Sequence, residues 1–377
     1  MHVPVLFILC TAEITAVLSV EKMIIYVNAR FLTQPVTGVQ RYAIECSRKI
    51  KKLYPNTLFL TPHNLCNKNV AKELDAIIVG THTGHVWEQI DLPRYLNKNN
   101  ASAPLFNPCN TAPLTYSYNY ITLHDLAFHI HPEWNSRLFS TWYNFLIPRL
   151  VAKCQHLFTV SNSIRTAIQD IYCLPSSSVS VTYNGIATEM MTIDTVVKAP
   201  KQKMILAVGS FNIRKNHQSL INAFIHSSIK DSYTLVLVGD ENKVFRDTGI
   251  NRQTLKDNNI TLHNHLSDQE LIDLYCQAEI LVSLSAYEGF GIPLLEGLFF
   301  GCKLVCSDIP VYRELYATVA TFTAPYSQEA ILQALYTAIA ATAPSSHIVS
   351  QLCSVYNYDV SASIILHKML QSKIAAG

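Results

Sequence analysis

One stretch of the sequence decides the fold: Ser285-Ala286-Tyr287-Glu288-Gly289-Phe290-Gly291-Ile292-Pro293-Leu294-Leu295-Glu296-Gly297. It follows Ile280–Leu284, a short apolar run rich in branched side chains, which is typical of a buried strand. Pro293 suits the first position of a helix, because its missing N–H has no intrahelical partner there. Gly301 is placed to end that helix. The pattern therefore predicts a buried strand, a loop with glycines and a short helix.

Two carboxylates belong to this stretch: Glu288 in the loop and Glu296 in the first turn of the predicted helix. The carboxyl end of a strand, glycine N–H groups and a helix N-terminus together favour an anionic ligand. Carboxylates can also accept hydrogen bonds from hydroxyl groups. A ligand with both phosphate and hydroxyl groups is indicated, and a sugar nucleotide has both.

Length and composition predict a globular protein of two domains. The chain has 377 residues, more than one ordinary hydrophobic core accommodates. It is 49% hydrophobic and 15% charged, with a formal net charge of +2. Because no long run of Lys and Arg and no strongly basic half occurs, we expect no nucleic-acid partner.

Cysteines and histidines do not predict a metal site. The 10 cysteines include no C-x-x-C pair, so free buried thiols in a reducing cytosol are expected rather than a zinc site or disulfides. His129 and His131 lie close together, but no carboxylate or cysteine stands at a recognised spacing from them. We therefore expect no bound metal.

Residues 1–22 are predicted to be an N-terminal extension outside the fold. Val3–Cys10 is similar to the core of a signal peptide, but no basic residue precedes it and Glu13 interrupts the apolar segment. Met23–Val27 is the better first strand. We interpret residues 1–22 as an upstream extension or a misassigned start, with a signal sequence or membrane anchor as the alternative.

Residues 23–190 are predicted to form a first Rossmann-like domain. Its expected strands are Ile24–Val27, Ala76–Val79, Tyr120–Leu123, His156–Val160 and Val179–Tyr183. Gly38 lies just before the helix that follows the first strand, where nucleotide-binding folds hold phosphate. Spacing alone leaves an ordinary tight turn equally open for Gly38.

His124 and Asp125 follow a predicted strand directly. Polar side chains at the carboxyl end of a parallel strand usually face the ligand crevice, although a helix cap or a loop-stabilising pair is the alternative. The aromatic stretch Trp134–Leu150 is predicted to be a helix that packs on the core. A surface that faces a membrane or an acceptor is the alternative for that helix.

The strand–helix alternation restarts at Met204–Val208, so residues 204–360 are predicted to form a second Rossmann-like domain. The irregular stretch 186–203 is the expected linker, and residues 361–377 are expected to contain a C-terminal helix.

The first loop of the second domain carries Ser210, Arg214 and Lys215. The two cations stand just before a helix predicted to begin at His217, where they oppose the helix dipole. A bound diphosphate would explain cations at this place, and a solvated surface pair is the alternative.

The chain resembles the retaining glycosyltransferases of family 4, which have the GT-B fold, from Met23 to about residue 370. The most specific part of the resemblance is the pair Glu288 and Glu296, separated by seven residues. The other matching segments are Val208–Gly209 with Arg214–Asn216, Thr37–Tyr42, His124–Asp125, Thr159–Ser161 and Tyr183–Gly185. The resemblance implies an α/β protein of two Rossmann-like domains that face each other across a cleft. Thr37-Gly38 departs from the paired glycines that many relatives carry.

The resemblance also implies roles for individual residues. Arg214 and Lys215 would neutralise the donor diphosphate as it leaves, with no required metal or other cofactor. Glu296 would accept hydrogen bonds from the ribose, and Glu288 would hold the transferred sugar. The implied catalytic residues are Glu288, His124, Arg214 and Lys215. The implied donor-binding residues are Gly38, Ser210, Arg214, Lys215, Glu288, Gly289, Phe290, Gly291, Ile292 and Glu296, with the nucleotide-sugar donor as a substrate.

Thr37–Tyr42, His85–Gln89 and Asn110–Pro113 resemble a subgroup of bacterial surface-polysaccharide enzymes, which make lipopolysaccharide and O antigen. That subgroup favours a hexosyltransferase that moves mannose from GDP-mannose to a growing, lipid-linked glycan. We expect a cytoplasmic protein, with a peripheral place on the inner face of the cytoplasmic membrane as an alternative. A catalytically silent sugar-nucleotide-binding or assembly subunit, or another GT-B enzyme such as an epimerase, remains an alternative function.

Overall fold

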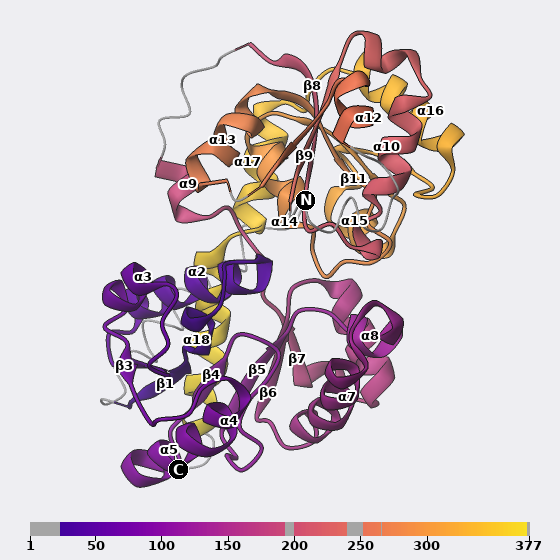
Figure 1. Ribbon diagram of the computed structural model, residues 1–377. Coiled ribbons are helices and arrows are strands. Elements are labelled where there is room, and N and C mark those ends of the chain that lie inside the picture. Colours follow the sequence, from indigo (N-terminus) through magenta and orange to yellow (C-terminus); the bar gives the residue numbers. More distant parts are fainter. Residues whose placement is uncertain (1–22, 193–199, 240–251, 265, 375–377) are drawn as a thin grey trace. The chain divides into compact units, whose positions relative to one another are not determined.

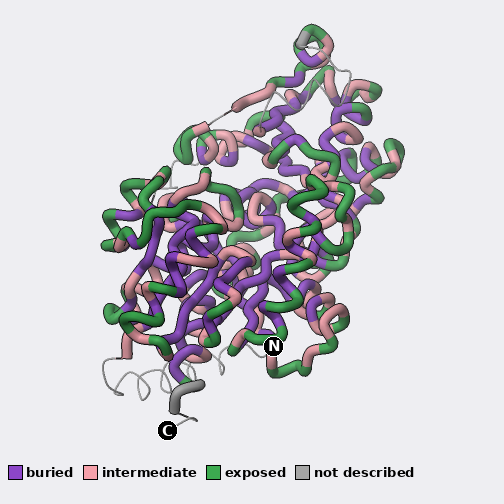
Figure 2. The backbone as a smooth tube through the Cα atoms, turned by 60° about the horizontal axis from the view of Figure 1, so that its bottom comes forward, coloured by how far each residue is buried: buried purple, intermediate pink, exposed green. Residues whose placement is uncertain are grey.

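The computed structural model describes residues 23–192, 200–239, 252–264 and 266–374. The predicted extension 1–22 lies outside the described residues. The chain divides into two compact units, one made of residues up to Asn184 together with those from Asn357 on, and the other of Gly185–Tyr356. We call them unit 1 and unit 2. Each has a parallel sheet flanked by helices (Figure 1), with buried residues concentrated in its interior (Figure 2).

Unit 1 has a seven-stranded parallel sheet in the order β3-β2-β1-β4-β5-β6-β7. The strands are β1 Ile25–Asn28, β2 Thr57–Thr61, β3 Ile77–Ile78, β4 Leu105–Asn107, β5 Asn119–Leu123, β6 His156–Thr159 and β7 Val179–Val181. The helices are α2 Gly38–Leu53, α3 Lys68–Glu73, α4 Gly84–Val86, α5 Leu92–Asn100, α6 Ala127–Ile130, α7 Arg137–Val151, α8 Asn162–Tyr172 and α18 Tyr358–Ile374. A π-helical turn, Trp87–Asp91, follows α4.

Unit 2 has a six-stranded parallel sheet in the order β10-β9-β8-β11-β12-β13. The strands are β8 Gln202–Val208, β9 Thr234–Val238, β10 Ile260–His263, β11 Ala278–Ser283, β12 Lys303–Ser307 and β13 Ala320–Thr323. The helices are α9 Thr188–Thr192, α10 His217–Ile225, α12 Arg252–Asp257, α13 Asp268–Gln277, α14 Ile292–Phe299, α15 Pro310–Tyr316, α16 Gln328–Ala340 and α17 Ser346–Val355.

Both sheets reverse their strand order next to their first strand. The reversal lies between β1 and β4 in unit 1 and between β8 and β11 in unit 2. Loops at the carboxyl ends of the two strands diverge at such a topological switch point and leave a crevice, which is where open α/β sheets bind ligands. The switch points are therefore the places to search for a site.

The strand, loop and helix predicted around Glu288 are confirmed, with one correction. Helix α14 begins at Ile292, so Pro293 is its second residue rather than its first. Glu296 was expected in the first turn of this helix, but it lies one residue beyond that turn. Gly291, before the helix, has the left-handed φ of +89°. A Cβ atom there would lie 2.5 Å from Cε1 of Tyr312, so both the backbone and the space require glycine.

The C-terminal helix belongs to unit 1 rather than to the domain that precedes it in sequence. The chain returns to unit 1 at Asn357, against the predicted domain end at residue 360. In α18, Oγ of Ser361 donates to the carbonyl of Tyr183 (2.7 Å), and Asp359 pairs with Lys49 of α2 (2.9 Å). Among the described residues, no helix is long and apolar enough to cross a membrane.

Candidate functional site

Two loops meet at the switch point of unit 2. The first follows β8 and carries Arg214 and Lys215, and the second follows β11 and carries Glu288. The backbone N–H of Ala286 donates to the carbonyl of Arg214 (2.8 Å), which joins the two loops directly. The local folding of each loop thus brings together residues that lie far apart in the sequence.

Glu288 lies between the two cations. Its Oε1 is 2.5 Å from Nζ of Lys215, and its Oε2 is 3.3 Å from Nη1 of Arg214. The exposed fractions of the side chains are 8% for Glu288, 15% for Lys215 and 22% for Arg214. Both cations are thus partly buried and paired with one carboxylate. We call these three residues the Glu288 cluster.

The charges of this cluster favour an anionic ligand. Burial raises the pKa of Glu288, but Lys215, Arg214 and a hydrogen bond from Ser285 outweigh burial and hold that pKa below its ordinary value. At neutral pH the cluster therefore contains two cations and one anion. A phosphate group, which like the Glu288 carboxylate is an anion that accepts hydrogen bonds, could bind the same two cations.

Glu296 is buried in α14 and accepts a hydrogen bond from Oη of Tyr275 in α13 (2.7 Å). The Phe290 ring packs edge-on against Tyr356, so we expect only the backbone of Phe290 to contact a ligand. Oη of Tyr316 donates to the carbonyl of Gly291 (3.1 Å). These contacts fix the loop and the start of α14. Gly289 is buried and Ile292 is partly exposed.

Ser210 is exposed, and its Oγ accepts a hydrogen bond from Nδ2 of Asn212 (3.0 Å). His217, the first residue of α10, is buried against Phe211 with ring centroids 4.7 Å apart. Burial, with a contribution from Lys215, lowers the pKa of His217 to about 4, so this ring is neutral beside the cations. Sequence reasoning missed the supporting roles of His217 and Tyr275, because each depends on a partner from another element.

Gly38 and His124 lie in unit 1. Gly38 is the exposed first residue of α2, whose N-terminus is capped by a hydrogen bond from the Thr37 N–H to Oε1 of Gln40 (3.2 Å). His124 is buried, and its Nε2 donates to the carbonyl of Pro108 (2.7 Å), which leaves Nδ1 as an acceptor in the neutral ring. Burial lowers the pKa of His124. Asp125 accepts from the N–H of Ala127, the first residue of α6 (3.0 Å), although the N-cap position of that helix is occupied by Leu126.

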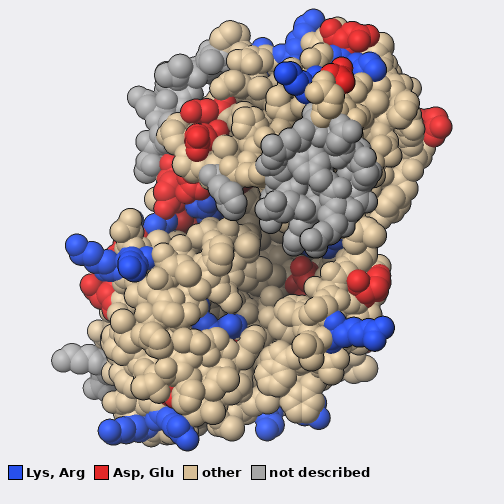
Figure 3. All heavy atoms as spheres, in the orientation of Figure 1, with Lys and Arg blue, Asp and Glu red and all other residues tan. Residues whose placement is uncertain are grey.

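The described residues contain no group of three or more His, Cys, Asp and Glu side chains that could hold a metal ion. On the face that Figure 3 shows, charged side chains lie in small separate groups, and most of the surface is uncharged. Among the described residues on this face, no broad basic patch is visible.

The part of the chain that carries the Glu288 cluster matches a known protein family. Residues 192–348 match the family model "Glycosyl transferases group 1". The chain is 32% identical over 225 residues to the O-antigen chain mannosyltransferase RfbU of Salmonella typhimurium. This alignment covers 57% of this chain and 59% of that protein. It is 25% identical over 223 residues to the O-antigen chain mannosyltransferase B of Escherichia coli, covering 56% and 58%. The alignments thus span about three fifths of each of these relatives.

Solved structures extend the likeness to the whole fold. Anabaena Alr3699/HepE, solved in complex with UDP, superposes with a TM-score of 0.67 at 14% identity, covering 93% of this chain and 100% of that one. At this identity the likeness concerns the fold alone. The two parallel sheets with a switch point each are those of the GT-B architecture.

Proposed function

Because residues 192–348 belong to the glycosyl transferases group 1 and the chain has the GT-B fold, we propose that the protein is a retaining glycosyltransferase. It transfers a hexose from a sugar nucleotide to a growing polysaccharide. The observation that carries this proposal is the Glu288 cluster at the switch point of unit 2, where two cations share one carboxylate.

In the proposed mechanism, the donor diphosphate takes over the two cations from Glu288. Lys215 and Arg214 then neutralise the negative charge that grows on the diphosphate as the bond between the sugar C1 and the phosphate oxygen breaks. The acceptor oxygen forms its bond to C1 on the same face, and its proton passes to the leaving phosphate oxygen. No cofactor takes part in these steps.

The two glutamates have separate roles in this proposal. Glu288, released from the cations, accepts hydrogen bonds from the transferred sugar, and the N–H groups of Gly289–Ile292 lie in the same loop. Glu296, held by Tyr275, accepts hydrogen bonds from the ribose hydroxyls. Ser210 contacts the phosphates. For Gly38 and His124 of unit 1, a role in donor binding stays a prediction from the family resemblance.

The donor we propose first is GDP-mannose, and the acceptor is a lipid-linked glycan of the O-antigen type. The support is that two relatives are named O-antigen chain mannosyltransferases. A UDP-sugar is the competing donor, and the screen described below separates the two.

We place the protein in the cytoplasm, peripherally on the inner face of the cytoplasmic membrane. The support is α7, which exposes Leu138 (86%), Phe139 (40%) and Phe145 (45%) and contains no acidic residue. Arg149 lies over the Phe145 ring, 3.8 Å from its centroid. Exposed apolar rings beside arginines suit an anionic lipid surface.

Sedimentation with vesicles of anionic lipid tests this placement. The wild type should sediment with the vesicles, and Leu138→Glu should stay in solution. Equal sedimentation of both proteins would exclude α7 as the contact.

A thermal-shift screen across GDP-, UDP-, ADP- and CMP-sugars tests the proposed function, combined with measurement of nucleoside diphosphate release in the presence of octyl glycosides. We expect one nucleotide class to raise the unfolding temperature, and an octyl glycoside to increase the release. Binding without release, unaltered by Glu288→Ala, would instead indicate a silent sugar-binding subunit. Conversion of the donor sugar to its epimer without transfer would indicate an epimerase.

A further inference from the structure

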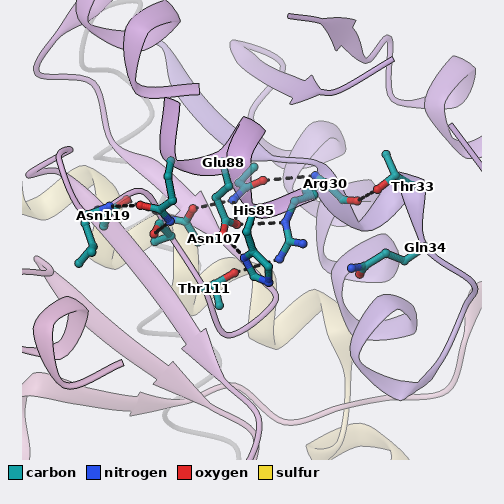
Figure 4. A network of polar contacts seen from close by, with 12 residues as sticks. Arg30, Thr33, Gln34, His85, Glu88, Asn107, Thr111 and Asn119 are labelled. Atoms are coloured by element: carbon teal, nitrogen blue, oxygen red, sulfur yellow. Dashed lines mark hydrogen bonds and ion pairs between the residues drawn. The ribbon is translucent and has the colours of Figure 1, made fainter. Parts of the chain in front are cut away.

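A buried polar network lies at the other switch point, in unit 1 (Figure 4). Asn28 ends β1 and Asn107 ends β4, and Nδ2 of Asn28 donates to Oδ1 of Asn107 across the switch point (3.1 Å). Glu88, in the π-helical turn, accepts from Nδ2 of Asn28 (2.8 Å) and from Nε of Arg30 (3.2 Å). π-Helical turns are rare and are frequently found at functional sites.

The charges inside this network cancel. The side chains of Arg30 and Glu88 are 8% and 1% exposed, and Nη2 of Arg30 donates to Oγ1 of Thr111 (3.0 Å). Burial raises the pKa of Glu88, but Arg30, His85 and Asn28 together bring it down to about 2. Burial lowers the pKa of Arg30, and Glu88 raises it above its ordinary value. Because one cation balances one anion, the network suits an uncharged polar ligand better than a phosphate or an ammonium group.

His85 is the member of the network that reaches the surface. Its Nδ1 is 3.3 Å from Oε2 of Glu88, and its side chain is 37% exposed. A carboxylate can only accept, so Nδ1 carries the proton, and Nε2 of the neutral ring has a lone pair. The ring also meets Trp142 and Tyr143 of α7 edge-on, with centroids 5.9 Å and 6.4 Å apart. Glu88 and the aromatic side chains thus fix how the imidazole is presented.

We propose that His85 binds the acceptor glycan, with Nε2 accepting a hydrogen bond from a sugar hydroxyl and the half-buried Trp142 ring beside it contacting the apolar face of the sugar. Glu88 and Arg30 are positioning residues that fix the tautomer and orientation of His85. This inference rests on the proposed function, because it assigns the substrate class that unit 1 would bind. It predicts that His85 affects the acceptor and leaves the donor untouched.

The test compares His85→Ala and His85→Gln with wild type, using octyl α-mannoside and the octyl glycosides of glucose, galactose and N-acetylglucosamine. Binding is measured by saturation-transfer NMR without donor, and transfer is measured with the donor that the thermal-shift screen selects. We expect His85→Ala to raise the acceptor KM at least tenfold and to leave the donor-induced thermal shift and donor hydrolysis unchanged. His85→Gln, whose amide oxygen can still accept a hydrogen bond, should recover part of the loss.

His82→Ala is the matched control. His82 lies just before the same segment and also pairs with a carboxylate, Oδ1 of Asp91, through Nδ1 (2.9 Å), but no Arg–Glu pair is connected to it. This control should keep the wild-type acceptor KM. Equal acceptor KM values for wild type and His85→Ala, or equal losses in His82→Ala and His85→Ala, would overturn the proposal.

The outcomes also separate this inference from the proposed function. Donor hydrolysis by wild type without binding of any octyl glycoside would defeat the inference and leave the proposed function standing. Glycoside binding that His85→Ala abolishes, in a protein that neither binds nor consumes any sugar nucleotide, would support the sugar site and defeat the proposed transferase.

Discussion

At the residue scale, Glu288 compensates the charge of the two cations that stand before α10. In the proposed reaction the donor diphosphate displaces this carboxylate from Lys215 and Arg214. The carboxylate competes with the donor diphosphate for the two cations, and it then contacts the transferred sugar. It should therefore oppose the binding of the diphosphate but favour the transfer of the sugar.

Glu288→Gln should therefore leave the affinity for a nucleoside diphosphate undiminished while lowering the transfer rate about a hundredfold, the size of a lost charged contact in a transition state. Binding is measured by calorimetry and transfer by diphosphate release. Glu279→Gln is the control, because Glu279 also pairs with a lysine of unit 2, Lys303 (2.9 Å), but lies at the amino end of β11, opposite the loop that carries Glu288. A parallel loss of binding and transfer in Glu288→Gln would show that the residue only supports the fold.

Glu88 should make the free energy of unfolding of unit 1 depend on pH. Its pKa falls from 4.5 to about 2 on folding, which corresponds to about 3 kcal/mol of stability. Because the folded-state pKa is depressed, this stability is fully present above pH 4.5 and is lost as the pH falls toward 2. The difference in the free energy of unfolding between wild type and Glu88→Gln should therefore shrink between pH 5 and about 3. A difference that stays constant over that range would mean that Glu88 is not the charged partner of Arg30.

How far the sequence predicts individual residues depends on whether their partners are local. Arg214, Lys215, Glu288 and Glu296 were named because each lies in a loop or helix start that its own neighbours determine. The ion pair between Lys215 and Glu288 joins residues 73 positions apart, and no local pattern encodes it. The same holds for Tyr275 and Glu296, which are 21 positions apart. His85 and Glu88 are only three positions apart, but their partner Arg30 lies 58 positions from Glu88, and the sequence marked the segment only as part of a subgroup resemblance.

At the element scale, α14 depends on its first residues. Gly291→Ala should destabilise the protein by about 2–5 kcal/mol, because the left-handed backbone costs about 1–2 kcal/mol and the clash with Tyr312 about 1–3 kcal/mol. Gly301→Ala is the matched control. Gly301 has a similar φ of +79°, but the nearest atom to its Cβ would be Cε of Lys201 at 3.8 Å, so only the backbone cost applies. Urea unfolding measures both, and equal destabilisation would contradict the role of Tyr312.

The elements that their own residues determine most clearly are those with a strong local signal. Helices α8, α13 and α16 each begin after a serine whose side chain accepts a backbone hydrogen bond, and Ser267 with Glu270 forms a capping box at the start of α13. Strands β2, β4 and β13 were missed. Leu105–Asn107 is only three residues long, and Ala320–Thr323 mixes small and polar side chains. Such strands are determined by the sheet that surrounds them rather than by their own composition.

At the scale of the whole molecule, the chain begins and ends its described part in unit 1. The sequence predicted two Rossmann-like domains, because strand–helix alternation repeats along the chain. It did not predict that α18 packs with α2, because the order of elements does not say which unit a terminal helix joins.

A chain that ends at Tyr356 should consequently lose stability in unit 1 before unit 2. Removal of α18 uncovers the face of α2 against which it packs and deletes the contacts to Lys49 and Tyr183. Limited proteolysis followed by mass spectrometry should show cleavage within 23–184 at protease concentrations that leave 185–356 intact. Earlier cleavage of 185–356 would contradict the assignment of α18 to unit 1.

Titration calorimetry with GDP, UDP and ADP tests most directly whether the Glu288 cluster is the diphosphate site. Lys215→Ala should weaken the binding of the preferred nucleoside diphosphate at least tenfold, since a hydrogen bond to a charged group contributes about 1.5–3 kcal/mol. Lys303→Ala, in the same unit, should bind as wild type does. Wild-type affinity in Lys215→Ala, or no binding of GDP, UDP or ADP by wild type, would contradict the diphosphate site and the glycosyl transfer built on it.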